Sequence, residues 1–316
     1  MRVNDRIAII GAGHVGSTAA YALMLRALFR EIVLIDSDPA LAEAEAADIS
    51  DANALARPAR IWAGDYGDVA SARIAVITAG AATHGSESRL AVAARSAKIV
   101  ERCVEELMTA GFDGILVIAS NPVDLMAHLA LTASGLPAAR VIGTGTLLDS
   151  SRLRQSLSTL LDVAPGTING VVVAEHGDSE VAAFSTIRVA GLPLKDFAAS
   201  DMPDCAKLAE EVRTDGYRII AGKGYTSYGV ATAIVRICEA ILRDERAAFP
   251  VSTLLTGEFG LTDIYLSLPC ILGSGGIERV VPPALTKTEI AELQASAATV
   301  RSAQDGLRAS PDKGSL

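Results

Sequence analysis

Aromatic and basic residues are scarce in this chain of 316 residues. Aromatics make up 4% of it, and the 28 lysines and arginines are outnumbered by 37 acidic residues, which gives a net charge of −9. An acidic surface repels phosphates, and few rings are available to stack on bases. Binding to nucleic acid is therefore disfavoured.

Cysteines and long apolar runs are also lacking. The four cysteines are far apart and show no C-x-x-C spacing, which argues against a disulfide framework or a zinc site and suits a reducing cytoplasm. No apolar run reaches the length of a membrane span. Residues 7–10 are apolar and follow Arg2 and Arg6, but Gly11 and Gly13 end this run too early for a signal peptide. We expect a cytoplasmic protein without a metal site or a membrane segment.

Half of the residues are hydrophobic, and in the first 145 residues they form short runs separated by helical patterns. The strand-like runs are residues 7–10, 32–35, 74–78 and 115–119. Strands this uniformly apolar are buried on both faces, as in a parallel sheet covered by helices. We predict an α/β fold in which residues 1–145 form a doubly wound, Rossmann-type domain.

From residue 146 the regular alternation of strand and helix patterns ends, and we assign residues 146–316 to a mixed α/β (α+β) catalytic domain. Strand patterns separated by glycine-rich turns predict antiparallel sheets. The expected strands are residues 167–174, 181–189, 251–256, 265–272 and 276–281. Apolar residues at helical spacing predict helices over residues 150–162, 204–223, 226–243 and 286–307.

A glycine-rich turn follows the first strand and opens a helix. It consists of Gly11, Ala12, Gly13, His14, Val15 and Gly16. Such a turn lets a pyrophosphate approach the backbone at the helix N-terminus. Asp36 ends the next strand twenty residues later, where it would accept hydrogen bonds from ribose hydroxyls and repel a 2′-phosphate. This pattern favours NAD over NADP; the alternative is a structural glycine turn beside an unrelated surface acid.

His176 is one of only four histidines, and it follows the β-branched residues 171–173. A rigid strand followed by Gly177 and Asp178 is a suitable place for a proton carrier, although a structural, hydrogen-bonded histidine is the alternative. Asp149 and Arg152 are three residues apart at the start of a predicted helix, so they share one face. The alternative role is a helix cap for Asp149 and a surface cation for Arg152.

Two further polar segments follow predicted strands. Arg89 ends the polar stretch 80–89, before an amphipathic helix over residues 90–107, and the glycine and serine content of this stretch suits a loop that closes over a site. Asn121 lies in the segment Ser120-Asn121-Pro122-Val123-Asp124, where it can position a cofactor or a substrate hydroxyl. The alternative is a solvated loop for residues 80–89 and an Asn-Pro turn for residues 120–124.

Taken together, these segments resemble the L-lactate and malate dehydrogenase family over essentially the whole chain. The matching segments are residues 11–16, 78–81, 120–124, 148–152, 175–179, 223–227 and 250–255. Tyr225, Thr226 and Ser227, with the segment 251–255, favour the lactate branch.

The resemblance implies a catalytic role for each matching residue. His176 would donate a proton to the carbonyl of a 2-oxo acid while NADH delivers hydride, and Asp149 would orient the imidazole. Arg152 would bind the substrate carboxylate, and Arg89 would polarise the carbonyl with help from Asn121. Other matching residues would contact the cofactor or line the substrate pocket; these are Thr78, Ala79, Gly80, Thr226 and Val230.

The chain departs from the family pattern at Thr83, which matches the position that reads the substrate side chain. Lactate enzymes usually have Gln there and malate enzymes Arg, whereas Thr83 cannot neutralise a second carboxylate. Neighbouring His84, if protonated, is an alternative partner for such a group. Thr83, Gly85 and Gly216 leave room beyond that needed for pyruvate. We therefore expect a monocarboxylic 2-oxo acid, either pyruvate or a bulkier analogue.

The resemblance also bears on regulation and assembly. Lactate dehydrogenases activated by fructose 1,6-bisphosphate have an Arg and a His at the effector interface; Arg154 matches the first, but Asn169 stands in place of the second. Activation by this sugar phosphate is therefore not expected. Family habit implies a homodimer or a homotetramer.

Two other functions stay open. Malate dehydrogenase is the nearest alternative, and a catalytically silent NAD-binding redox sensor is an alternative of another class. The presence of His176, Asp149, Arg152 and Arg89 argues against the silent protein, because binding NAD alone does not require all four.

Overall fold

A twisted sheet of nine strands runs through the computed structural model, which describes residues 5–56, 58–81 and 89–309. Six strands are parallel in the order β3-β2-β1-β4-β5-β6, the Rossmann order. Their bounds are β1 Arg6–Ile10, β2 Glu31–Ile35, β3 Arg60–Ala63, β4 Ala72–Ile77, β5 Ile115–Ile118 and β6 Val141–Gly143. The predicted doubly wound parallel sheet is confirmed.

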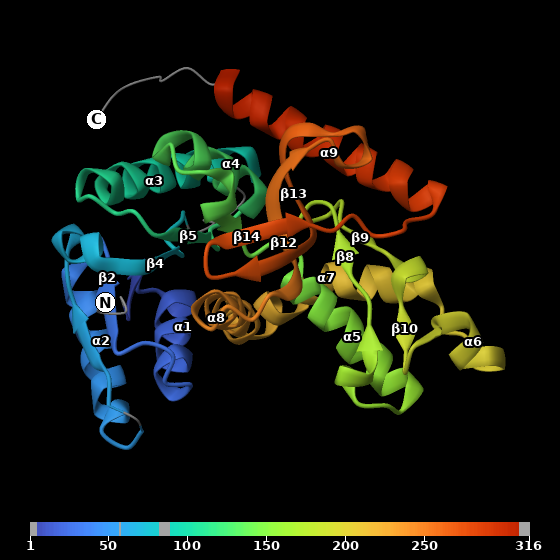
Figure 1. Ribbon diagram of the computed structural model, residues 1–316, viewed down its shortest axis with the longest axis horizontal. Coiled ribbons are helices and arrows are strands. Elements are labelled where there is room, and N and C mark those ends of the chain that lie inside the picture. Colours follow the sequence, from blue (N-terminus) through green and yellow to red (C-terminus); the bar gives the residue numbers. More distant parts are fainter. Residues whose placement is uncertain (1–4, 57, 82–88, 310–316) are drawn as a thin grey trace.

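Helices cover both faces of this sheet (Figure 1), and a separate apolar core lies beneath each face. Alternate residues of β1 show the division, since Ala8 and Ile10 belong to one core and Ile7 and Ile9 to the other. The helices over the first core are α3 Arg89–Thr109, α4 Val123–Ser134 and α9 Lys287–Ala309. Those over the second are α1 His14–Leu25, α2 Pro39–Asn53 and α8 Tyr228–Leu242.

Three antiparallel strands from the second half of the chain extend the same sheet. They are β12 Ala247–Thr256, β13 Thr262–Gly273 and β14 Gly276–Val280. Ser252 of β12 pairs with Gly143 of β6, so the antiparallel part continues the parallel part directly. The predicted antiparallel pairing is present, but these strands belong to the Rossmann sheet rather than to a sheet of their own.

The remaining elements form a smaller lobe with its own core. Leu153 and Leu157 of α5 Leu147–Leu161 pack there with Leu208 and Val212 of α7 Cys205–Lys223. The two helices lie side by side in Figure 1. The lobe also holds two small sheets and a short helix. These are β7 Ile168–Asn169 with β10 Arg188–Val189 and β11 Leu192–Pro193, β8 Val172–Val173 with β9 Val181–Ala182, and α6 Leu194–Ala198.

Two strands predicted in this lobe are shorter than expected. The run 167–174 divides into β7 and β8, and the run 181–189 into β9 and β10 with a 3₁₀ turn between them. The reason is that each half pairs with a different partner, β7 with β10 and β8 with β9. A continuous apolar run indicates burial but not which sheet buries each part.

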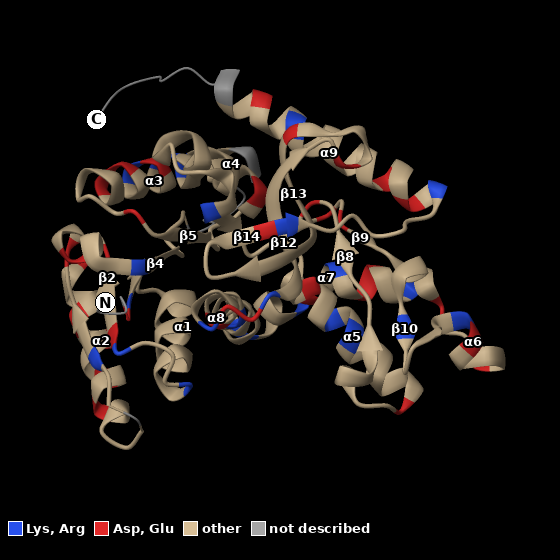
Figure 2. Ribbon diagram, viewed as in Figure 1, with Lys and Arg blue, Asp and Glu red and all other residues tan. Residues whose placement is uncertain are grey.

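Charged residues lie mainly on the helices, and both signs occur along α3 and α9 (Figure 2). Within the described residues, no helix is both long and apolar enough to span a membrane.

Candidate active site

The glycine-rich turn between β1 and α1 is held by contacts that only glycine permits. Gly11 has φ +103°, and a Cβ there would lie 2.6 Å from the Ala79 backbone nitrogen. A Cβ at Gly16 would lie 1.8 Å from the Gly11 carbonyl oxygen. At Gly13, directly before α1, a Cβ would meet no heavy atom within 4 Å. The turn is thus tightly packed on the protein side and open at the helix N-terminus, which suits a bound pyrophosphate.

The ends of neighbouring parallel strands meet around this turn. Asp36, just after β2, accepts hydrogen bonds from the backbone nitrogens of Ala12 (2.7 Å) and Asp38 (2.9 Å). Thr78, after β4, donates to the Gly11 carbonyl oxygen at 2.8 Å. Ser120, after β5, donates to the Ala79 carbonyl oxygen at 2.5 Å. The predicted residues Asp36, Thr78 and Ala79 are therefore brought together at the carboxyl edge of the sheet, where this fold binds dinucleotides.

The loop between α7 and α8 contacts the same turn. The rings of His14 and Tyr225 stack with their centroids 3.7 Å apart and their planes inclined by 13°. This contact brings Thr226, the next residue, near the glycine-rich turn. Val230 is half-buried on α8 against the core that α1 also covers.

His176, Asp149 and Arg152 form one connected cluster. The His176 Nδ1 atom lies 2.6 Å from Oδ2 of Asp149, and Arg152 Nη1 lies 2.9 Å from Oδ1 of the same carboxylate. Asp149 is 1% exposed, and the side chains of Arg152 and His176 are 15% and 24% exposed. One buried carboxylate therefore orients both an imidazole and a guanidinium that reach solvent.

Backbone contacts fix the segment that carries His176. The Val172 nitrogen of β8 donates to the Ser150 hydroxyl of α5 at 2.8 Å. Ala174 and Ser267 of β13 exchange two backbone hydrogen bonds of 3.0 and 2.9 Å. The His176 nitrogen donates to Oδ2 of Asp124 at 2.9 Å. The histidine is thus held between α5, β13 and the start of α4.

Charge and burial change the pKa of both partners in the pair. Burial by itself would lower the pKa of His176, but the charge and hydrogen bond of Asp149, with the nearby carboxyl groups of Asp124 and Glu180, raise it to about 9. Burial opposes ionisation of Asp149, but the charges and hydrogen bonds of His176 and Arg152 outweigh it and lower its pKa. The pair is therefore an imidazolium and a carboxylate at neutral pH.

Three acids that the sequence analysis did not single out contact this cluster. Asp124 is 2% exposed, receives the His176 backbone hydrogen bond and accepts a hydrogen bond from Ser252. Glu180 is 6% exposed, and its carboxyl lies within 4.8 Å of the ligating atoms of Asp149 and His176. Asp215 of α7 pairs with Arg152. Asp124 belongs to the matching segment 120–124, whereas the only sequence signal of Glu180 and Asp215 is that each lies within four residues of a predicted site residue.

The other predicted residues fall in different places. Gly216 lies beside the cluster, since a Cβ there would be 3.7 Å from Arg152 Nη2. Asn121 is exposed between β5 and α4 and precedes Pro122 through a cis peptide bond. Arg89 begins α3, but its side chain lies outside the described part, as do Thr83, His84 and Gly85.

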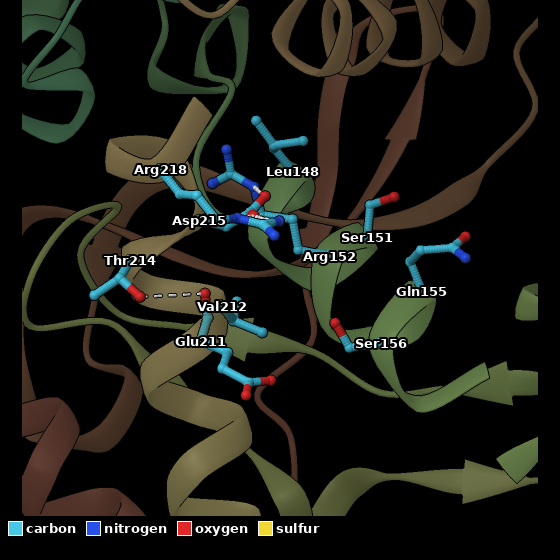
Figure 3. Close-up of a pocket in the computed structure, with 10 residues that line it drawn as sticks. All are labelled: Leu148, Ser151, Arg152, Gln155, Ser156, Glu211, Val212, Thr214, Asp215 and Arg218. Carbon is cyan, nitrogen blue, oxygen red and sulfur yellow. Dashed lines mark hydrogen bonds and ion pairs between the residues drawn. The ribbon is translucent and has the colours of Figure 1, made fainter. Parts of the chain in front are cut away.

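A pocket of about 670 Å³ opens between α5 and α7 next to this cluster (Figure 3). Arg152 and Asp215 line it, with polar side chains of both helices along its walls. Because Arg152 contacts Asp149, which in turn contacts His176, the pocket is linked to the histidine through the Asp149 carboxylate. A guanidinium facing a pocket suits an anionic ligand.

A Rossmann sheet with an open glycine turn and an acid at β2, beside a buried Asp–His pair, defines a dinucleotide-dependent oxidoreductase. The chain matches two family models, the lactate/malate dehydrogenase NAD binding domain over residues 5–143 and the lactate/malate dehydrogenase alpha/beta C-terminal domain over residues 146–309. The protein thus belongs to the lactate/malate dehydrogenase family, and its cofactor is NAD, as predicted.

Individual relatives agree with this assignment. The chain is 41% identical to an L-lactate dehydrogenase of Priestia megaterium and 40% identical to one of Limosilactobacillus fermentum, and 95% of the chain is aligned with 96% and 95% of these relatives. The structure superposes on the minor L-lactate dehydrogenase of Enterococcus mundtii in its ligands-bound form with a TM-score of 0.94 at 37% identity, covering 96% of this chain and 98% of the other. The resemblance read from the motifs is confirmed.

Proposed function

We propose that the protein is an NAD-dependent L-lactate dehydrogenase that interconverts a monocarboxylic 2-oxo acid, pyruvate or a bulkier analogue, and its L-2-hydroxy acid. The observation that carries this proposal is the 2.6 Å contact of His176 with Asp149, whose second oxygen holds Arg152. Asp149 thereby positions both a proton donor, His176, and an anion-binding group, Arg152. The relatives named L-lactate dehydrogenase support the same activity.

His176 would act as the general acid in reduction and the general base in oxidation. With Nδ1 bonded to Asp149, Nε2 is the nitrogen left to carry the transferable proton. Asp149 remains ionised and stabilises the imidazolium until the proton leaves. General acid catalysis of this kind typically contributes ~10²–10⁴ in rate.

Arg152 would bind the substrate carboxylate, because its planar fork can donate two parallel hydrogen bonds. Arg89 would polarise the substrate carbonyl with Asn121, as the family resemblance implies. Gly216 and Thr226, together with Thr83, would surround the substrate side chain. Gly216 contributes by leaving the space beside Arg152 open.

The glycine-rich turn and the strand ends around it would hold the cofactor. Gly13 leaves room for the pyrophosphate, Asp36 would accept hydrogen bonds from the adenosine ribose, and the segment from Thr78 to Gly80 would lie along the dinucleotide. NADH, when bound, supplies the hydride and its two electrons.

Oxaloacetate is the substrate that separates lactate from malate dehydrogenase. It would bring a second carboxylate into the site, and Thr83 offers no charge to pair with it. We therefore expect pyruvate or a bulkier monocarboxylic acid to be preferred.

A substrate panel with NADH tests this function. Pyruvate, 2-oxoisocaproate, phenylpyruvate and oxaloacetate are compared by kcat/KM from NADH absorbance, with His176→Asn as the control. We expect one of the monocarboxylic acids to rank first and His176→Asn to lose ~10²–10⁴ of the rate. A highest kcat/KM for oxaloacetate would favour malate dehydrogenase. Tight NADH binding without turnover of any 2-oxo acid would favour the silent sensor.

We also propose, from the family resemblance, a homodimer or homotetramer in the cytoplasm that is not activated by fructose 1,6-bisphosphate. Sedimentation velocity measures the assembly, and an assay with added sugar phosphate measures the activation.

A further inference from the structure

Arg152, the proposed carboxylate-binding residue, is already shared by two carboxylates. Asp149 contacts Nη1 at 2.9 Å. On the other side, Oδ2 of Asp215 lies 3.3 Å from Nε, a contact drawn in Figure 3. A carboxylate can approach a guanidinium end-on, through its two Nη atoms, or side-on through Nε. Asp215 therefore stands at one of the two edges that a substrate carboxylate could use.

Asp215 has a second cationic partner on its own helix. Its other oxygen, Oδ1, accepts hydrogen bonds from Nε of Arg218 at 3.1 Å and, more closely, from Nη2 of the same side chain. The Arg218 side chain is 82% exposed, whereas those of Asp215 and Arg152 are 20% and 15% exposed. The carboxylate thus bridges a mostly buried guanidinium and a solvent-facing one.

Arg152 does not need Asp215 to be held in place. It lies one helical turn from Asp149, which is 1% exposed and fixes Nη1. Gly216 leaves the space beside Nη2 open, since a Cβ there would be 3.7 Å away and no closer atom is met. A substrate carboxylate that binds Arg152 would become its third carboxylate, and like charges this close repel strongly in a partly buried site.

We propose that Asp215 is a specificity-determining residue that competes with the substrate carboxylate for Arg152, and that Arg218 holds Asp215 when the substrate binds. This inference rests on the proposed role of Arg152. The single contact between Asp215 and Arg152 thus lowers the affinity for the substrate and raises the selectivity among substrates. Asp215 weakens the binding of every 2-oxo acid, and because it lines the pocket beside Arg152, its charge also repels a second carboxylate on the substrate.

Replacing Asp215 with its neutral isostere tests the competition. Asp215→Asn should lower the KM for pyruvate about fivefold to tenfold and leave kcat within about twofold, because the change affects ground-state and transition-state binding alike. The KM for oxaloacetate should fall by a larger factor than that for pyruvate. A residue that merely supports the fold would not produce this separation of KM from kcat.

Replacing Arg218 should change the KM for pyruvate in the opposite direction. Arg218→Gln removes the alternative partner of Asp215, so Asp215 should bind Arg152 more strongly and the KM for pyruvate should rise. The double variant should match Asp215→Asn, since Arg218 acts only through Asp215. Glu210→Gln is the matched control, because it removes one acid from an exposed face of α7 that pairs with Arg213 instead; its KM should equal that of the wild type.

The outcomes separate this inference from the proposed function. Arg152→Lys should raise the KM for pyruvate strongly; if it does not, the proposed function of Arg152 fails. If it does, but Asp215→Asn leaves the KM unchanged or raises it, the competition is wrong and Asp215 only positions Arg152. An equal fall of KM in Glu210→Gln would also overturn it, since the effect would then be one of net charge. Thermal melts of each variant show that it is folded.

Discussion

Asp149 contacts two cationic residues, one with each of its oxygens, and these contacts explain how a buried carboxylate can stay ionised. Oδ2 contacts His176 and Oδ1 contacts Arg152, so the proton donor and the anion-binding group are aligned by one side chain. Burial would otherwise favour the neutral acid, but both partners stabilise the charge. Loss of Asp149 would disturb proton transfer and substrate binding together.

The pH dependence of catalysis tests this pairing. In the wild type, pyruvate reduction needs protonated His176 and should persist until the pH rises through a pKa of about 9. Asp149→Asn removes the carboxylate charge that raises this pKa, so the alkaline limb of kcat/KM should move to lower pH, with a loss of ~10²–10⁴ in rate. Lactate oxidation, which needs neutral His176, should gain relative activity near pH 7. Rate profiles from pH 5.5 to 10.5 measure both, and an unmoved limb would contradict the pairing.

Glu180 is a buried acid in the same cluster, and Oε1 of its carboxyl has no hydrogen-bond partner among the described residues. Burial and the charge of Asp149 raise the pKa of Glu180 to about 8, while His176, Arg213 and Arg152 act in the opposite direction. A carboxyl group with a raised pKa favours the folded state at low pH, and this contribution is lost as the pH rises through about 8.

Glu180→Gln should therefore raise the melting temperature, and the gain should increase from pH 6 to pH 9. The same variant should slightly lower the pKa of His176, because ionised Glu180 helps to raise it. Calorimetry at several pH values measures the stability. Glu175→Gln is a suitable comparison, since Glu175 already accepts a hydrogen bond from Ser179. A pH-independent gain would show that Glu180 does not titrate in this range.

At the scale of elements, the start of α5 and the short strand β8 form the frame that sets the distance from His176 to Asp149. The Ser150 hydroxyl, buried next to Asp149, accepts a hydrogen bond from the backbone nitrogen of Val172 in β8. The Thr146 hydroxyl donates a hydrogen bond to the Val172 carbonyl oxygen at 2.6 Å. His176 follows β8 by three residues. A shift of β8 on α5 would therefore separate the histidine from its carboxylate.

Ser150→Ala tests this frame. It leaves the buried Val172 nitrogen without its partner, which typically costs about 1–3 kcal/mol. We expect a lower melting temperature and a lower kcat, while the dissociation constant for NADH, measured by fluorescence, stays unchanged because the glycine-rich turn is not altered. Ser158→Ala, at a buried hydroxyl farther along α5, is the control for general loss of helix stability. Equal loss of kcat in both variants would contradict a specific role for Ser150.

At the scale of the whole molecule, the two halves of the chain share the nine-stranded sheet and the apolar cores on both of its faces. β12 pairs with β6, and α8 covers the face of the sheet on which α1 and α2 lie. Ile234, Ile237 and Ile241 of α8 are completely buried there. The predicted boundary at residues 145 and 146 marks a change of pattern in the sequence, but the core continues across it.

A fragment of residues 1–145 should therefore not fold cooperatively. Without α8 and β12 it exposes apolar residues on one face of the sheet and leaves the edge of β6 unpaired. We expect binding of a hydrophobic dye and a broad thermal transition, whereas the full chain should melt sharply and be stabilised further by NADH. A fragment with a sharp melt that binds NADH would show that the first domain is autonomous.

The sequence by itself determined the features that depend on neighbours along the chain. The parallel sheet follows from uniformly apolar runs, the glycine-rich turn from six consecutive residues, and the shared face of Asp149 and Arg152 from a spacing of three. Each of these is a local property of the backbone, so one sequence is sufficient to predict it.

Only the tertiary structure decided which distant groups meet. Asp124, Glu180 and Asp215 are ordinary acids in the sequence, yet they converge on His176 and Arg152 from α4, the loop after β8 and α7. The division of the apolar runs between two small sheets has the same cause. Contacts between distant segments depend on how the elements pack in three dimensions, and no local pattern of residues encodes that packing.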